Sequence, residues 1–184
     1  VYGYASGEYR ILHEQANKWF AVTKGDLWQG DLLLKLDGYK LSGSGLWWLL
    51  FGLNNNWSDF YTFEILPDYQ EWYIFNFNST NGWSVVASGN ANYILSGQGK
   101  NNLLIQGADE RMYFYINNYQ VYYMGERQGF VGLTGGSFSK NTHLRYDNYL
   151  FQHNECSALS FQMEGSKDFP AVFTEENHLF LPNN

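Results

Sequence analysis

Residues 111–124 read Arg-Met-Tyr-Phe-Tyr-Ile-Asn-Asn-Tyr-Gln-Val-Tyr-Tyr-Met and are the most diagnostic segment of the chain. From Met112 to Ile116, apolar side chains alternate with more polar ones, as in a strand with one buried face. Asn117-Asn118 suits a two-residue turn, because asparagine tolerates the positive φ that such turns require. Tyr119–Met124 again has the aromatic and β-branched residues typical of strands. The segment therefore predicts an antiparallel β-hairpin.

The same strand-and-turn pattern continues through most of the chain in both directions. Turn signals such as Asn81-Gly82 and Gly135-Gly136 separate the apolar runs. Further strands are predicted at Tyr9–His13, Lys18–Val22, Asp31–Leu41, Ser44–Leu53, Asp59–Leu66, Trp72–Asn78, Trp83–Ala87, Asn102–Gly107, Phe130–Thr134 and His143–Gln152. Many short strands at regular spacing, without helices between them, favour a sandwich or a barrel.

The chain length of 184 residues suits one domain of this kind. We expect residues 1–153 to form the sandwich. Residues 154–184 are less regular and acidic, and they end in the short apolar run His178–Leu181. We expect this C-terminal extension to pack on the sandwich or on a partner, with self-assembly as one outcome.

Composition narrows the classes of function. The net charge is −7 and no cluster of lysine and arginine stands out, which argues against a nucleic-acid partner. No apolar run is long enough for a transmembrane helix. The single cysteine, Cys156, cannot form a disulfide within the chain. Aromatic residues make up 20% of the chain, and this excess is the strongest functional signal.

Several motifs, in their order along the chain, resemble those of the concanavalin A-like jelly-roll superfamily. They are Phe60–Ile65 with Glu71–Phe75 and Asn81-Gly82-Trp83, Asn101–Ile105 with Met112–Asn117, Gly129–Leu133, and Leu144–Asn148. The most similar members are laminin-G-like and 3-keto-disaccharide hydrolase-like domains. The resemblance implies an all-β fold, with two antiparallel sheets packed as a jelly-roll sandwich. It does not imply one function.

We do not expect an enzyme. Glycosidases need two carboxyl groups about 5–10 Å apart across the scissile bond. The Glu-x-Asp-x-x-Glu strand of laminarinase-like relatives is missing here, because Glu64 has no acidic residue at the +2 position. The four histidines, His13, His143, His153 and His178, show no metal-ligand spacing. A glycoside-acting enzyme therefore stays an alternative that only the resemblance supports.

No cofactor is expected, with Ca²⁺ as the alternative. Many laminin-G-like sandwiches bind calcium through loop oxygens, so the resemblance implies calcium as a candidate ligand of this chain. The oxygen-rich candidates are Asp26, Asp31, Asn54, Asn55, Asn56 and Asp59. None lies in a defined Asp-x-Asn-x-Asp loop, and turn formation explains such residues equally well.

Strand alternation selects the candidate ligand-binding residues. If Tyr73, Phe75 and Phe77 face the core, then Trp72 and Asn76 face outward, since a buried Asn76 without a partner would cost about 1–3 kcal/mol. The same reasoning places Glu64 outside in its own strand. The predicted binding residues are Glu64, Trp72, Asn76, Arg111, Tyr113, Tyr115 and Tyr122. The register decides this set as a unit, because a slip of one residue exchanges the two faces.

These observations favour a non-catalytic, extracellular carbohydrate-binding or adhesive domain, secreted or held at the cell surface. Its partner would be an oligosaccharide or polysaccharide that stacks on the outer aromatic–polar face. The alternative of a different class is a structural subunit of an extracellular assembly, or a sensor domain of a surface protein.

Overall fold

The computed structural model describes residues 2–5, 7–28, 31–153 and 172–173, and all the regular elements in these ranges are strands. None of the described residues form a helix long and apolar enough to span a membrane. The expectations for Cys156 and for most of the C-terminal extension lie outside the described residues. Within that extension, only Val172 and Phe173 are described, and they pair with Val22 and Ala21.

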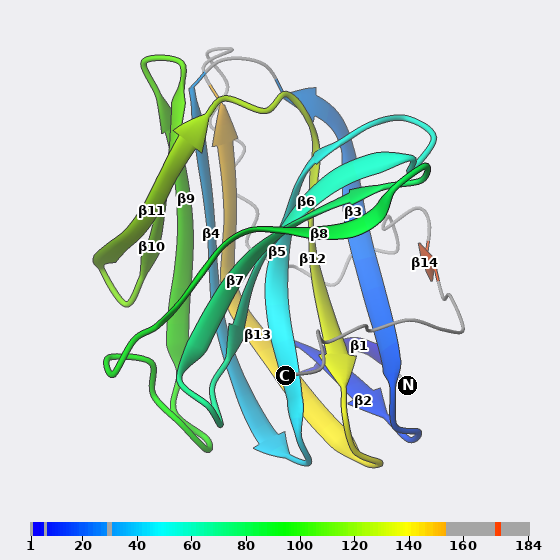
Figure 1. Cartoon of the computed structure of the whole chain (residues 1–184). Coiled ribbons are helices and arrows are strands. Elements are labelled where there is room, and N and C mark those ends of the chain that lie inside the picture. The colour runs from blue at the N-terminus through cyan, green and yellow to red at the C-terminus, as the bar shows by residue number, and fades with distance from the viewer. Residues whose placement is uncertain (1, 6, 29–30, 154–171, 174–184) are drawn as a thin grey trace.

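The described residues form two antiparallel sheets of seven strands each. Figure 1 shows how the sheets are arranged. Sheet A has the order β1 (Tyr2–Ala5), β2 (Glu8–His13), β13 (Thr142–His153), β4 (Leu32–Ser42), β9 (Asn101–Ala108), β10 (Arg111–Ile116) and β11 (Tyr119–Gly125). Sheet B has the order β14 (Val172–Phe173), β3 (Lys18–Trp28), β12 (Gly129–Ser137), β5 (Gly45–Leu53), β6 (Asp59–Leu66), β7 (Glu71–Asn78) and β8 (Gly82–Asn90). The predicted two-sheet jelly-roll sandwich is confirmed.

Tight turns connect neighbouring strands where the sequence has asparagine or acidic residues. Asn117 and Asn118 have φ values of 50° and 70° and join β10 to β11, which confirms the predicted hairpin. Asp109 and Glu110 have φ values of 52° and 60° and join β9 to β10 in the same way. Positive φ at both turn residues gives the twist that matches paired strands.

The core lies between the two sheets and is rich in aromatic side chains. Phe114 of sheet A packs against Phe51 and Phe63 of sheet B, with ring centroids 5.4 and 5.2 Å apart. Trp47 is fully buried beside Gly38, where an added Cβ would lie 2.5 Å from the indole nitrogen. A glycine at this position therefore allows the two sheets to approach around the largest core side chain.

An ion pair connects the two sheets near one end of the sandwich. Lys40 of β4 has the same alternation as the core residues Leu34 and Leu36, yet its ammonium contacts both oxygens of Asp68 at 2.7 and 2.6 Å. Asp68 lies in the turn between β6 and β7. The buried lysine is thus paired, as a charged group at the edge of a core must be.

Candidate functional site

The outer surface of β9, β10 and β11 carries the predicted residues that do face away from the core. Met112, Phe114 and Ile116 are fully buried, so alternation directs Arg111, Tyr113 and Tyr115 to the opposite side of β10. Arg111 is exposed, and the two tyrosines are partly exposed. The orientation predicted for these three residues is confirmed.

Contacts with β11 gather these residues into one surface, which we call the tyrosine face: Gln106, Arg111, Tyr113, Tyr115, Gln120 and Tyr123. Tyr123 lies opposite Tyr113 and is 55% exposed, and their ring centroids are 6.4 Å apart. The Arg111 guanidinium carbon lies 5.5 Å from the centre of the Tyr123 ring. Such stacking orients an arginine while leaving its N–H groups free to bind a ligand.

Amide side chains complete the tyrosine face. Gln106 of β9 is opposite Tyr113, and Gln120 of β11 is opposite Tyr115. Both glutamines are exposed. Gln106, Gln120 and Tyr123 are not among the predicted residues. Regular pairing of the predicted strands could have found Gln106 and Gln120, but not Tyr123, which reaches the outer side only because β11 contains a bulge. Aromatic rings flanked by amide and guanidinium donors can hold a ligand that has both apolar and hydroxylated surfaces.

The prediction for Tyr122 is wrong because β11 contains a bulge. A regular hairpin with a two-residue turn would pair Tyr122 with the outward Tyr113. The register instead shifts at Val121, so that Tyr122 lies opposite Phe114. Its ring packs against the core, 6.3 Å from Phe114 and 6.4 Å from Trp72. One extra residue in a strand is enough to exchange the two faces beyond it.

The predictions for Trp72 and Asn76 are also wrong, because β7 has the opposite orientation. Trp72 is only 7% exposed and packs in the core between the sheets with Ile74. Gly89 of β8 pairs with Trp72 and leaves room for the indole. Asn76 shares the inward side but donates to Asp59 Oδ1 at 2.9 Å and to the Phe60 carbonyl at 3.2 Å. The assumed cost of an unpartnered Asn76 therefore does not arise.

The aromatic side of β7 faces away from the core and is nevertheless covered. Phe75 and Phe77 contact Trp83, with ring centroids 6.1 and 5.2 Å away. Phe77 also stacks on Phe60 at 5.0 Å. The outer side of sheet B thus holds its own apolar clusters, which explains why the purely aromatic side of β7 is not the core side.

Glu64 lies on the predicted side of β6 but is not accessible there. Its neighbours across the strands are Trp48 and Tyr73, and it is only 4% exposed. Thr62 Oγ1 donates to Glu64 Oε1 at 2.5 Å. Burial raises the pKa of Glu64 to about 8, although the Thr62 hydrogen bond acts in the opposite direction. A neutral acid in an aromatic surrounding suits packing, and the prediction of an exposed ligand-binding carboxylate is wrong.

Two of the calcium candidates, Asn54 and Asn56, use their side-chain oxygens within their own loop. Asn54 Oδ1 accepts from the Ser58 and Asp59 amides at 2.9 and 3.3 Å, and Asn56 Oδ1 accepts from Ser58 Oγ at 2.7 Å. No cluster of three or more His, Cys, Asp or Glu side chains occurs among the described residues. Burial lowers the pKa of His13 to about 4. The calcium alternative stays a prediction.

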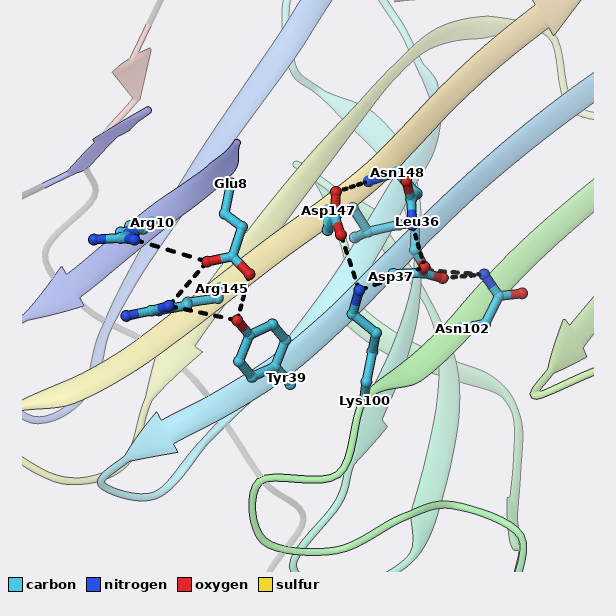
Figure 2. Close-up of polar contacts among 10 residues, drawn as sticks. All are labelled: Glu8, Arg10, Leu36, Asp37, Tyr39, Lys100, Asn102, Arg145, Asp147 and Asn148. Carbon is cyan, nitrogen blue, oxygen red and sulfur yellow. Dashed lines mark hydrogen bonds and ion pairs between the residues drawn. The ribbon is translucent and has the colours of Figure 1, made fainter. Parts of the chain in front are cut away.

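Figure 2 shows a second polar region, on the outer side of β2, β13 and β4. Arg145 donates to Glu8 Oε2 at 2.9 Å, and Arg10 lies 3.8 Å from the same oxygen. Along the same side, Lys100 contacts Asp147 at 2.9 Å and Asp37 at 4.0 Å. No sequence motif predicts this region, because its residues come from strands that lie far apart in the sequence.

The chain resembles known proteins in its fold but not in its sequence. Neither a protein-family model nor the sequence of a curated protein matches the chain. Among solved structures, the carbohydrate-binding module CBM66 from Bacillus subtilis is 14% identical, with a TM-score of 0.63 over 83% of this chain and 91% of that one. A Bacillus subtilis protein of unknown function with a galectin-like fold is 9% identical, with a TM-score of 0.60 over 79% of this chain and 82% of that one.

An enzyme has the same architecture. A prokaryotic β-1,3-1,4-glucanase (lichenase), derived from a mouse hindgut metagenome, is 11% identical, with a TM-score of 0.55 over 79% of this chain and 80% of that one. At these identities the similarity concerns the fold alone, which binding modules and hydrolases share. The chain therefore has the concanavalin A-like jelly-roll fold expected from its motifs.

Proposed function

We propose that this chain is a non-catalytic carbohydrate-binding domain and that the tyrosine face is its binding surface. The observation that carries the proposal is the contact of Arg111 with the exposed ring of Tyr123, next to Tyr113. Sugars present apolar C–H surfaces that pack on aromatic rings, while their hydroxyls bind amide and guanidinium groups. The mixed chemistry of the tyrosine face fits both requirements.

The arrangement of the rings favours an extended ligand. Tyr113 and Tyr115 are two residues apart on one strand, so they repeat along β10 at roughly 6.6 Å. Both lie on a strand paired on each side, which fixes their positions before a ligand arrives. A preorganised surface loses little entropy on binding. An oligosaccharide or polysaccharide, as found outside cells and on their surfaces, is the partner that we propose.

The test is a binding screen against soluble and insoluble polysaccharides, by calorimetry and by affinity gels. We expect saturable binding by the wild type, and a loss of about three- to tenfold in affinity for Tyr113→Ala and for Tyr123→Ala. Tyr69→Ala is the matched control, because Tyr69 is 65% exposed in the β6–β7 turn of the other sheet. Equal binding by all four proteins would refute the site.

The same experiment separates sugar binding from self-assembly. Exposed aromatic surfaces also form contacts between proteins. Light scattering of the wild type and Tyr123→Ala over a range of concentrations measures this directly. Association that the substitution abolishes, together with no binding to any polysaccharide, would assign the tyrosine face to an assembly and overturn the proposed function.

A further inference from the structure

Two arginines lie side by side on the outer side of sheet A. Arg10 of β2 pairs directly with Arg145 of β13, and Arg145 pairs in turn with Tyr39 of β4. On the other side of Arg10 the partner is Gly3 of β1, which brings no side chain. Like charges directly opposite each other on neighbouring strands are destabilising unless an anion lies between them.

Among the described residues, one carboxylate, that of Glu8, contacts this arginine pair. Glu8 Oε2 is 2.9 Å from Arg145 and 3.8 Å from Arg10, and Glu8 Oε1 accepts a short hydrogen bond from the Tyr39 hydroxyl. Both oxygens of Glu8 are thus engaged. Two guanidinium groups and one carboxylate leave a formal charge of +1 on a protein whose net charge is −7.

The donors of the arginine pair outnumber its acceptors. Each guanidinium has five N–H groups, and the Nε atoms of Arg10 and Arg145 are both buried without a hydrogen-bond partner. Buried polar atoms normally have partners, so two such atoms on adjacent side chains mark an incomplete site. The pKa of the nearby His143 is lowered, first by burial and then by the positive charges of Arg145 and Arg10.

The neighbouring acidic cluster on the same sheet face provides a contrast, as Figure 2 shows. Asp37 accepts from Asn102 and Asn148 at 2.6 and 2.7 Å, and Asp147 accepts from Lys100 at 2.9 Å. There each carboxylate has donors from the chain itself. The arginine pair lacks this balance, although both clusters lie on the outer side of sheet A.

We propose that Arg10 and Arg145 form an oxyanion site that takes a carboxylate or sulfate group of a ligand. The planar guanidinium fork matches two oxygens of such a group, and charge-assisted bonds of this kind are short and strong. The Tyr39 hydroxyl borders the site, and Gly3, paired with Arg10, adds no side chain to it. The site uses none of the residues of the tyrosine face, so it stands independently of the proposed function.

Thermal unfolding and calorimetry with sodium sulfate and with sodium glucuronate test the proposal, against sodium chloride at matched ionic strength. We expect saturable stabilisation of the wild type by the oxyanions and none by chloride. Arg145→Gln and Arg10→Gln should each weaken binding at least tenfold. Glu8→Gln should strengthen it several-fold, since it removes the competing carboxylate.

Matched variants keep the result interpretable. Arg111 is an exposed arginine of the tyrosine face. The variants Arg111→Gln and Tyr123→Ala should both bind the anions like the wild type. Arg145→Lys keeps the charge but loses the fork, so it should fold and yet bind more weakly. The oxyanion site would be overturned if the wild type showed no saturable binding, or if the Arg10→Gln and Arg145→Gln variants bound the anions as tightly as the wild type. Either result would leave the sugar-binding proposal untouched.

Discussion

The outer sides of the two sheets are built by the same alternation and have opposite characters. On sheet A, the outward residues of β10 and β13, such as Tyr113 and Arg145, are partly exposed and polar. On sheet B, the outward residues Leu46, Trp48 and Leu50 of β5 are buried in apolar clusters of their own. Alternation therefore determines which side chains share a face, but it does not determine whether that face meets water.

This difference separates two roles. The outer side of sheet A offers charged, amide and tyrosine groups to a ligand at little cost in stability. The outer side of sheet B contributes burial, which stabilises the fold by roughly 25 cal/mol for each Å² of apolar surface removed from water. Substitutions on sheet B should therefore change stability, whereas those on sheet A should change binding.

Trp48→Ala should give the largest effect. Trp48 is 4% exposed and packs with Leu46 and Leu66, so its loss should lower the free energy of unfolding by about 3–5 kcal/mol. Tyr123→Ala, at an exposed position of sheet A, should lower it by roughly 0.5 kcal/mol or less. Urea unfolding at pH 5 measures both. Similar losses for the two variants would remove the distinction between the faces.

Glu64, on the outer side of sheet B, makes the free energy of unfolding of the protein depend on pH. The folded state raises the pKa of Glu64 from 4.5 to about 8, so the folded protein keeps a proton that the unfolded chain releases. Below the unfolded pKa of 4.5, the ionisation of Glu64 does not change the free energy of unfolding. As the pH rises from about 4.5 to about 8, it destabilises the folded protein progressively. Between pH 5 and pH 7 the cost should reach about 2–3 kcal/mol.

Urea unfolding of the wild type and Glu64→Gln from pH 5 to pH 8 measures this cost. The difference between the two proteins isolates Glu64 from His13, whose lowered pKa acts in the opposite sense. Glu110→Gln, in the exposed β9–β10 turn, is the control and should follow the wild type. Parallel curves for the wild type and Glu64→Gln would show that the carboxyl group is ionised and solvated.

The sequence predicts the strands better than it predicts their faces, and the reason is physical. The hairpin at residues 111–124 has a clear alternation and an unambiguous turn, so its existence is evident. The bulge at Val121 leaves no trace in the pattern, and it reverses Tyr122. In β7, both sides carry buried and partly buried residues, so the usual contrast between an apolar and a polar side is lost, and the prediction for Trp72 is wrong.

The arginine pair shows a second limit. Arg10 and Arg145 become neighbours only because β2 and β13 are adjacent in sheet A, although 135 positions separate the two residues in the sequence. A local pattern contains no information about such long-range pairing. In contrast, Tyr115 and Gln120 lie close to the predicted turn of one hairpin, so their pairing in the tyrosine face could be anticipated from the sequence. The contact of Arg111 with Tyr123 could not, because it depends on the bulge in β11.

Gly89→Ala should test the inward orientation of Trp72 with a smaller loss. An added Cβ would lie 2.9 Å from the indole nitrogen and 3.0 Å from Cε2, so the ring or the strand must shift. We expect a decrease of about 1–3 kcal/mol in the free energy of unfolding. Gly125→Ala in β11 is the matched control, since nothing lies within 4 Å of its added Cβ. A neutral Gly89→Ala would indicate that Trp72 lies elsewhere.

Lys100→Met should have the smallest effect, because it changes only the partly exposed acidic cluster on sheet A. Lys100 contacts Asp147 at 2.9 Å, and this hydrogen bond is the main reason why the pKa of Asp147 is lowered. Pairs of this kind contribute less than about 1 kcal/mol. Because the pKa of Asp147 is depressed, the contribution is present above the unfolded pKa of 3.8 and disappears as the pH falls through the folded value. Urea unfolding at pH 7 and at a series of pH values below 3.8 should therefore show a small loss at pH 7 that decreases as the pH falls below 3.8. Lys140→Met, in the exposed β12–β13 turn, should show no such pH dependence. A loss in Lys100→Met that did not decrease at low pH would mean that the lysine stem, rather than its charge, stabilises the sheet.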